Sequence, residues 1–266
     1  MNDPLRLAFG TLTAVPIEPP TSLRAPVPGR AMALAPLTGL VPGTAAAAAG
    51  WLALRLGLSA TVTAVIVVGL FELTTRGLHL DGLGDTADGL AASYQRERAL
   101  EVMRRGDTGP TGLAAVVLVL LLQTTALAQV LGHAVQQFSP GATGQLRAVV
   151  IVIVIAVAAR AAIPLACAQG VPAARPEGLG AAVAGSVSWA RLALTLTVTA
   201  LATAGGGLVA GFGWWAGPLA VLVVVTGAAA LIRRAVQRFG GITGDVIGAT
   251  VEIGVAASVL VLAALT

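Results

Sequence analysis

Long apolar runs separated by short polar segments dominate the sequence. Each run approaches the roughly 20 residues that a helix needs to cross a hydrocarbon layer about 30 Å thick. The runs cover residues 31–54, 59–80, 112–132, 147–169, 190–211, 213–232 and 246–265. The pattern predicts an all-α, polytopic membrane bundle of about seven transmembrane helices, with residues 1–266 forming one domain. Pro36 and Pro42 predict a kinked or partly re-entrant first span.

Composition supports a membrane protein built from helices. Hydrophobic residues make up 56% of the chain and charged residues only 11%, whereas a soluble domain carries about 25% charged residues. The low aromatic content of 4% does not favour a lipid-facing β-barrel. All 16 basic residues are arginines, scattered near the predicted helix ends. The net charge of +4 therefore reflects topology and does not predict a nucleic-acid partner.

The arginines also predict an orientation in the membrane. Cytoplasmic loops of membrane proteins carry an excess of basic residues. If the N-terminus is cytoplasmic, the outside loops hold only Arg55 and Arg147. The inside segments then hold Arg6, Arg24, Arg30, Arg96, Arg98, Arg104, Arg105, Arg175, Arg233, Arg234 and Arg238. We therefore expect a multi-pass protein of the inner (cytoplasmic) membrane, with its polar motifs on the cytoplasmic side.

The most informative polar stretch is Leu78-His-Leu-Asp-Gly-Leu-Gly-Asp-Thr-Ala-Asp-Gly-Leu90. It places Asp81, Asp85 and Asp88 at i, i+4 and i+7, which is one face of a helix. Like charges this close repel one another unless a cation lies among them. Mg²⁺ prefers such oxygen ligands, shared with substrate phosphates. The stretch predicts a Mg²⁺ site; the alternative is a solvated acidic helix end, favoured by the helix dipole.

Two further residues near this stretch are candidates for acid–base chemistry. Glu72 lies in an apolar run, where an ionisable group is costly and usually functional. An intrahelical pair with Arg76, four residues later, is the alternative. His79 precedes Asp81 by two residues and is a second candidate, although a lone histidine is more often a hydrogen-bonded structural group.

A second polar stretch covers residues 101–112 and contains Arg104, Arg105 and Asp107 beside a glycine-rich turn. Arginines and exposed backbone N–H groups before a helix can hold phosphates. The stretch therefore predicts phosphate or substrate binding by these residues. A basic cytoplasmic anchor followed by a turn is the alternative.

A third glycine-rich stretch ends in Thr243, Gly244 and Asp245 at the start of the last apolar run. A hydroxyl and a carboxylate placed there could complete a metal–phosphate site. A capped helix start would explain Thr243 and Asp245 without a function. Glu252 lies further inside the run, where a structural explanation is harder to find.

Arg160 lies in the middle of the fourth apolar run. Its charge predicts a partner within the bundle, because an isolated charge is strongly disfavoured there. The candidates are Glu72, Glu252 and a substrate phosphate. Cys167 is the only cysteine, so an internal disulfide is excluded.

Together these motifs resemble the cobalamin synthase family, adenosylcobinamide-GDP ribazoletransferase. The stretch 78–90 is similar to the family's most diagnostic segment, and Glu72 lies upstream at the expected place. The stretch 240–249, followed by Glu252, is similar to the C-terminal motif of the family. The segment Leu12-Thr-Ala-Val-Pro16 resembles its proline-containing N-terminal segment.

One motif departs from the family pattern. The middle motif of the family commonly reads Asp-Ser-Arg before Ile-Gly, whereas this chain has Arg105-Gly-Asp107 before Thr108-Gly109. The acidic and basic residues are present in exchanged order, so their separate roles are not carried over.

The resemblance implies the last assembly step of the corrinoid nucleotide loop. Adenosylcobinamide-GDP would react with α-ribazole, or with its 5′-phosphate, and GMP would leave. We then expect a site at the cytoplasmic face, Mg²⁺ on the three aspartates of 78–90, and phosphate contacts from Arg104 and Arg105. Glu72, Asp245 or His79, in that order, would assist deprotonation of the attacking hydroxyl. A homo-oligomer, or an association with other corrinoid-pathway enzymes, is left open.

Two other functions compete with this interpretation. CDP-alcohol phosphotransferases also hold a metal on clustered aspartates, but their Asp-Gly-x-x-Ala-Arg pattern is absent after Asp81-Gly82. A cation-coupled transporter would use Glu72, Arg160 and Glu252 as a relay at the membrane midplane.

Overall fold

A computed structural model describes residues 1–92, 94–137 and 141–266, and within them every named element is a helix. The long helices are α4 (Leu40–Arg55), α8 (Pro110–Gln137), α9 (Ala142–Ala159), α12 (Trp189–Val209), α13 (Ala216–Phe239) and α14 (Gly244–Ala263). The shorter ones are α1 (Asp3–Leu12), α2 (Val27–Ala33), α3 (Ala35–Thr38), α5 (Ala60–Leu73), α6 (Leu78–Ala92), α7 (Arg96–Val102), α10 (Ala162–Ala166) and α11 (Leu179–Val183).

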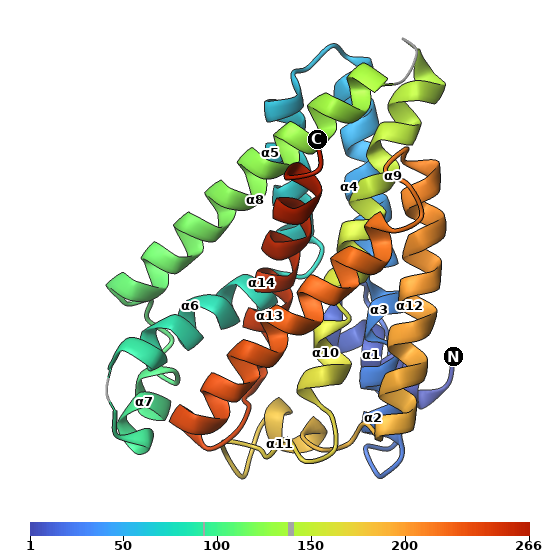
Figure 1. Ribbon diagram of the computed structural model, residues 1–266. Coiled ribbons are helices and arrows are strands. Elements are labelled where there is room, and N and C mark those ends of the chain that lie inside the picture. Colours follow the sequence, from blue (N-terminus) through green and yellow to red (C-terminus); the bar gives the residue numbers. More distant parts are fainter. Residues whose placement is uncertain (93, 138–140) are drawn as a thin grey trace.

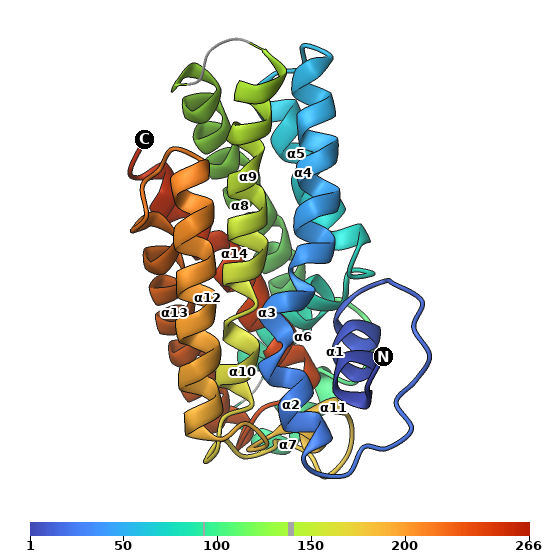
Figure 2. The same cartoon turned by 90° about the vertical axis from the view of Figure 1, so that its right-hand side faces the viewer.

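The long helices form a bundle, and most of the short helices gather at one end of it (Figure 1). Figure 2, turned by 90°, shows α4, α9 and α12 running along the bundle, with α1, α2, α7 and α11 near the same end. Helix α6 runs across the bundle in Figure 1 and contacts both α8 and α14. The polar motifs are therefore collected at one end of an apolar bundle.

Six helical segments of the described chain are long and apolar enough to cross a membrane, and a bent pair, α5 with α6, makes up to seven. The predicted all-α membrane bundle is therefore confirmed. The apolar run over residues 59–80 is not one continuous helix, because α5 ends at Leu73 and α6 leaves at an angle of 85°. Gly77 causes this break: it adopts φ +66° and its N–H donates to the Glu72 carbonyl oxygen at 2.8 Å, which closes the helix end.

The first span is interrupted, as its prolines predict. Helix α2 ends at Ala33, α3 runs only from Ala35 to Thr38, and α4 starts at Leu40. Helix α4 then packs against α9, and Gly39 just before α4 permits the close approach, since a Cβ atom added there would lie 2.6 Å from the Ala156 carbonyl oxygen. Small residues that let two backbones approach are the usual basis of helix association in membranes.

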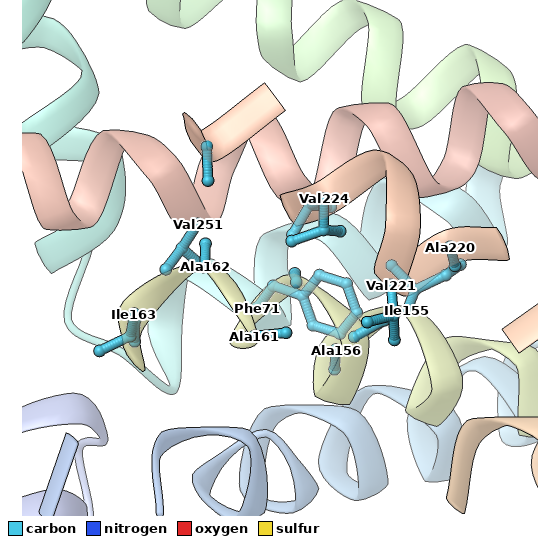
Figure 3. Packing of buried hydrophobic residues seen from close by; sticks show 14 of the residues in the cluster. Phe71, Ile155, Ala156, Ala161, Ala162, Ile163, Ala220, Val221, Val224 and Val251 are labelled. Carbon is cyan, nitrogen blue, oxygen red and sulfur yellow. The ribbon is translucent and has the colours of Figure 1, made fainter. Parts of the chain in front are cut away.

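The centre of the bundle is packed with alanine and β-branched side chains. Figure 3 shows Phe71 of α5 among residues of α9, α10, α13 and α14, including Ile155, Val224 and Val251. All four are buried. This packing surrounds the break between α9 and α10, where Arg160 ends α9, and it fixes the position of that charged residue inside the bundle.

Candidate active site where α6 crosses α14

Two glycines allow α6 to cross the first turns of α14 in direct contact. A Cβ atom at Gly82 would lie 2.6 Å from the Asp245 carbonyl oxygen, and one at Gly248 would lie 3.1 Å from His79 Cα. Only a residue without a side chain permits backbones to approach so closely. The stretches 78–90 and 240–249, which are far apart in sequence, therefore meet at this crossing.

The crossing brings three carboxylates together. Asp85 is half-buried and lies within electrostatic reach of Asp81 and Asp245. Asp81 is exposed, and Asp245 is half-buried at the start of α14. Their mutual repulsion makes this end of the bundle a favourable place for a cation or for a basic side chain.

Asp88, the third aspartate of the predicted stripe, is held by a different set of contacts. It is only 7% exposed, and its carboxylate accepts hydrogen bonds from the N–H groups of Gly109 at 2.7 Å and Gly112 at 2.8 Å. Gly109 directly precedes α8 and Gly112 lies in its first turn, where N–H groups have no partner within the helix. Asp88 thus fastens the start of α8 to α6.

Arg175 enters the site from the segment between α10 and α11, and sequence reasoning missed it as a site residue. Its Nη1 lies 4.0 Å from Asp245 Oδ2, and its Nη2 donates to the Leu100 carbonyl oxygen at 2.8 Å. Burial lowers the pKa of Arg175, and the charge of Asp245 opposes this shift. The sequence Arg175-Pro-Glu-Gly178 could have marked Arg175 as a candidate site residue, because it is a polar, turn-forming segment before a short helix.

A short backbone pairing holds this segment in place. The N–H of Ile242 donates to the Pro172 carbonyl oxygen at 2.9 Å, and the N–H of Ala174 donates to the Ile242 carbonyl oxygen at 2.9 Å. Arg96 of α7 adds a bond from its Nη2 to the Ala174 carbonyl oxygen at 2.9 Å. Arg175 is therefore positioned by its neighbours in the chain.

A cavity of about 290 Å³ opens beside the crossing. Its lining includes His79, Asp81, Arg175, Thr243 and Asp245. It thus combines carboxylates, a guanidinium and a helix N-terminus, which is a suitable environment for a phosphate-bearing ligand with a divalent cation.

Thr243 and Gly244 contribute to the wall of this cavity as the start of α14. The Thr243 hydroxyl accepts a hydrogen bond from the Val246 N–H at 3.2 Å and lies 3.1 Å from Asp245 Oδ2. The structure therefore shows the helix cap that was the alternative explanation for Thr243. The same contact orients Asp245.

The three candidates of the middle motif do not converge. Arg104 is exposed and lines a small cavity with Arg175. Arg105 pairs instead with Glu101, at 3.1 Å between Nη2 and Oε1, and lines another cavity with Asp107. Arg104 is thus the member of this motif that lies nearest to Arg175 and the crossing.

A second polar cluster lies deeper in the bundle. Glu252 is buried, and its Oε2 accepts a hydrogen bond from Gln123 Nε2 at 2.9 Å. Arg160 is 3% exposed and donates from Nη1 to the Ala156 carbonyl oxygen at 3.1 Å. Glu72, Arg160 and Glu252 lie within electrostatic reach of one another. No direct ion pair joins them within the described residues.

Several polar atoms of this buried cluster have no hydrogen-bond partner in the described part of the chain. They are Glu72 Oε2, His79 Nε2, Gln123 Oε1 and Arg160 Nε. Buried groups of this kind are usually satisfied by ordered water. The sequence analysis did not identify Gln123 as a candidate, although a polar amide within a long apolar run indicates a residue with a polar partner or a function.

The alternative pairing of Glu72 with Arg76 is wrong. Arg76 lies beyond the end of α5, where it adopts φ +59°, and its Nη2 donates to the Gly10 carbonyl oxygen at 3.3 Å. Because α5 has ended, the two residues no longer share a helix face. Glu72 therefore belongs to the buried cluster with Arg160 and Glu252.

Substitution of Glu72 tests its role in the buried cluster. Glu72→Gln is expected to lower kcat about tenfold while KM and the melting temperature change little, because it removes a negative charge within electrostatic reach of Arg160 and Glu252 without leaving a cavity. The same outcome is expected for Glu252→Gln. Turnover and thermal unfolding measured side by side provide the check. A normal kcat with a lowered melting temperature would assign the residue to the scaffold alone.

The residues at the crossing can be tested for their fit to Mg²⁺. Within the described residues, no group of three His, Cys, Asp or Glu side chains is arranged to hold a metal ion. Mg²⁺ is commonly bound by only one or two carboxylates together with substrate phosphates and water. Asp81 and Asp85 therefore fit a Mg²⁺ ion that is completed by a phosphate ligand.

Comparison with known proteins identifies the family. The family described as cobalamin-5-phosphate synthase matches residues 4–263. A relative from Nocardioides sp., named adenosylcobinamide-GDP ribazoletransferase, is 41% identical over 99% of this chain and 100% of its own length. A relative of the same name from Frankia casuarinae is 40% identical over 97% of this chain and 93% of its own. No solved structure matches significantly. The chain belongs to the cobalamin-5-phosphate synthase family.

Proposed function

We propose that this protein is an adenosylcobinamide-GDP ribazoletransferase. It joins GDP-activated adenosylcobinamide to α-ribazole, or to the 5′-phosphate of α-ribazole, and releases GMP. The observation that carries this proposal is the similarity to proteins of that name over nearly the full length of both chains. The carboxylates and arginines that meet beside the cavity suit a reaction at a diphosphate.

The bonds that change define what the site must do. A ribose hydroxyl of the acceptor attacks the phosphorus that bears the cobinamide, and a new P–O bond forms. The bond from this phosphorus to the bridging oxygen breaks, and GMP leaves with the electron pair. The hydroxyl proton passes to a carboxylate. Catalysis of such a transfer depends mainly on positioning and on neutralisation of charge.

Each part of this reaction has a candidate residue. Arg175 and Arg104 would hold phosphate oxygens, as arginines commonly do. Asp245 and His79 line the cavity, and Glu72 does not, so we propose Asp245 as the group that accepts the proton. Mg²⁺, when bound by Asp81 and Asp85 together with the diphosphate, would supply further neutralisation of charge.

A reconstitution assay tests the function directly. The protein, purified in detergent or nanodiscs, is incubated with adenosylcobinamide-GDP, Mg²⁺ and α-ribazole or its 5′-phosphate. We expect equal amounts of GMP and of the joined corrinoid, measured by chromatography. Absence of both products from a folded preparation would refute the proposal. Release of CMP from a CDP-alcohol, or ion flux in proteoliposomes without turnover, would favour one of the two competing functions.

The orientation of the chain in the membrane can be tested by cysteine labelling. We propose that the N-terminus and the end of the bundle that carries the site face the cytoplasm of the inner membrane, because the arginines concentrate there. Cysteines introduced as Glu97→Cys and Gln237→Cys, in a Cys167→Ser background, are expected to resist an impermeant thiol reagent in intact cells and to react after lysis. Both positions are exposed, whereas Cys167 is buried. Labelling in intact cells would reverse the orientation.

A further inference from the structure

Asp81 lies between two cavities. The first is the cavity of about 290 Å³ beside the crossing of α6 and α14. The second has a volume of about 520 Å³ and is lined by residues of α6 and α8 and of the turn before α6. Asp81 and Leu78 belong to the lining of both. A ligand in either cavity therefore reaches the same carboxylate.

The two cavities differ in chemistry. The cavity at the crossing contains Arg175, Glu177 and the polar start of α14. The cavity between α6 and α8 has an apolar wall made by Leu78, Leu80, Leu113 and Val116. A ligand with a flat, weakly polar ring suits the second cavity, because apolar pockets with few polar groups bind such rings well.

Arg76 supplies the basic group of the second cavity. It lies in the turn between α5 and α6 with φ +59°, a conformation that is uncommon for residues other than glycine. A guanidinium has five donors, and within the described residues Arg76 uses only Nη2, at 3.3 Å from the Gly10 carbonyl oxygen. The side chain is exposed and lines the cavity. It can therefore bind an anionic group on a ligand held there.

The chemistry of phosphoryl transfer gives the two cavities separate roles. The attacking and leaving oxygens lie roughly in line, on opposite sides of the reacting phosphorus. A site with the leaving GMP at one side of Asp81 and the acceptor at the other meets this requirement. The cavity with Arg175 suits the diphosphate, and the cavity with the apolar wall suits an aromatic nucleoside.

We propose that the cavity between α6 and α8 binds the acceptor and that Arg76 binds its 5′-phosphate. The aromatic base lies against Leu113 and Val116, and a ribose hydroxyl faces Asp81, at the boundary with the cavity that contains the proposed proton acceptor Asp245. Arg76 thereby sets the preference for the 5′-phosphate of α-ribazole over α-ribazole itself. This inference rests on the proposed function, because it assigns a place to one substrate of that reaction.

The test compares the two acceptors in the same preparation. Arg76→Gln is expected to lower kcat/KM for α-ribazole 5′-phosphate, relative to kcat/KM for α-ribazole, by about tenfold or more, because a charge-assisted contact is lost. Arg76→Gly is expected to give the same change, and it folds readily because glycine adopts positive φ without strain. Arg98→Gln, an exposed arginine of α7, is the matched control and should leave this ratio unchanged.

A second variant tests the position of the base. Val116→Phe places a larger side chain in the cavity between α6 and α8. It should raise KM for either acceptor about fivefold or more, with a much smaller effect on KM for adenosylcobinamide-GDP. The inference would be overturned if the wild-type protein turned over and both Arg76 variants kept the wild-type ratio of kcat/KM for the two acceptors, including the case of an equal loss for both. The proposed function would then still stand. No turnover by the wild-type protein with either acceptor would instead refute the proposed function.

Discussion

Asp85→Asn is expected to lower kcat/KM by about a thousandfold, which corresponds to roughly 4 kcal/mol of transition-state stabilisation. Asp85 is half-buried at the crossing of α6 and α14 and lies within electrostatic reach of three other carboxylates. Asparagine has nearly the same shape, so it removes the charge that a Mg²⁺ ion requires without disturbing the packing. Turnover with saturating and subsaturating Mg²⁺, measured beside thermal unfolding, provides the check.

The controls separate metal binding from a general loss of charge. Asp3→Asn changes a half-buried aspartate that accepts hydrogen bonds from Thr21 and lines neither cavity, and it should leave turnover unchanged. Excess chelator should abolish turnover by the wild-type protein, and added Mg²⁺ should restore it. Full activity of Asp85→Asn, or full activity in chelator, would exclude the proposed metal site.

The fold could be predicted from sequence because the apolar runs have the length of membrane helices. The exception at residues 59–80 has a physical reason. The run is continuous in composition, but Arg76 and Gly77 adopt positive φ and end the helix, so the second half turns aside as α6. A hydropathy pattern records polarity and contains no information on backbone dihedral angles. Because of this bend, α6 runs across the bundle and places Asp81 and Asp85 at its crossing with α14.

The site was predictable only in part, for a related reason. A helical stripe correctly places Asp81 and Asp85 on one element, but the partners of each side chain come from distant segments. Asp88 is held by glycines at the start of α8, and Arg175 approaches Asp245 from the loop before α11. These contacts depend on how α6, α8 and α14 cross, which spacing along one helix does not specify.

The glycines of the motifs show the same dependence on tertiary structure. Gly82 and Gly248 are required by the contact between α6 and α14, and Gly241 is required by the segment that carries Arg175, since a Cβ atom there would lie 2.5 Å from the Ala173 carbonyl carbon. The sequence alone does not specify what approaches the backbone at these glycines. The structure shows that at these three positions another part of the protein approaches it.

Arg160→Met is expected to destabilise the protein by about 3 kcal/mol or more, because it leaves the buried Glu252 and the half-buried Glu72 without the positive charge of Arg160. Arg160 is 3% exposed, and Glu252 is also 3% exposed. Methionine keeps much of the volume of the arginine stem, so the loss reports on charge rather than on a cavity. Denaturant or thermal unfolding in a fixed detergent provides the measurement.

A double substitution shows whether the charge is the cause. Adding Glu252→Gln to Arg160→Met removes one of the two uncompensated carboxylates, and it should recover at least about 1 kcal/mol, since neighbouring charges couple. Arg55→Met, at the exposed end of α4, should change the unfolding free energy by less than about 0.5 kcal/mol. If Arg160→Met instead unfolded like the wild-type protein and lost turnover, Arg160 would act on the substrate directly and not only as the partner of the two carboxylates. Equal destabilisation of the single and double variants would show that packing, not charge, sets the stability at this position.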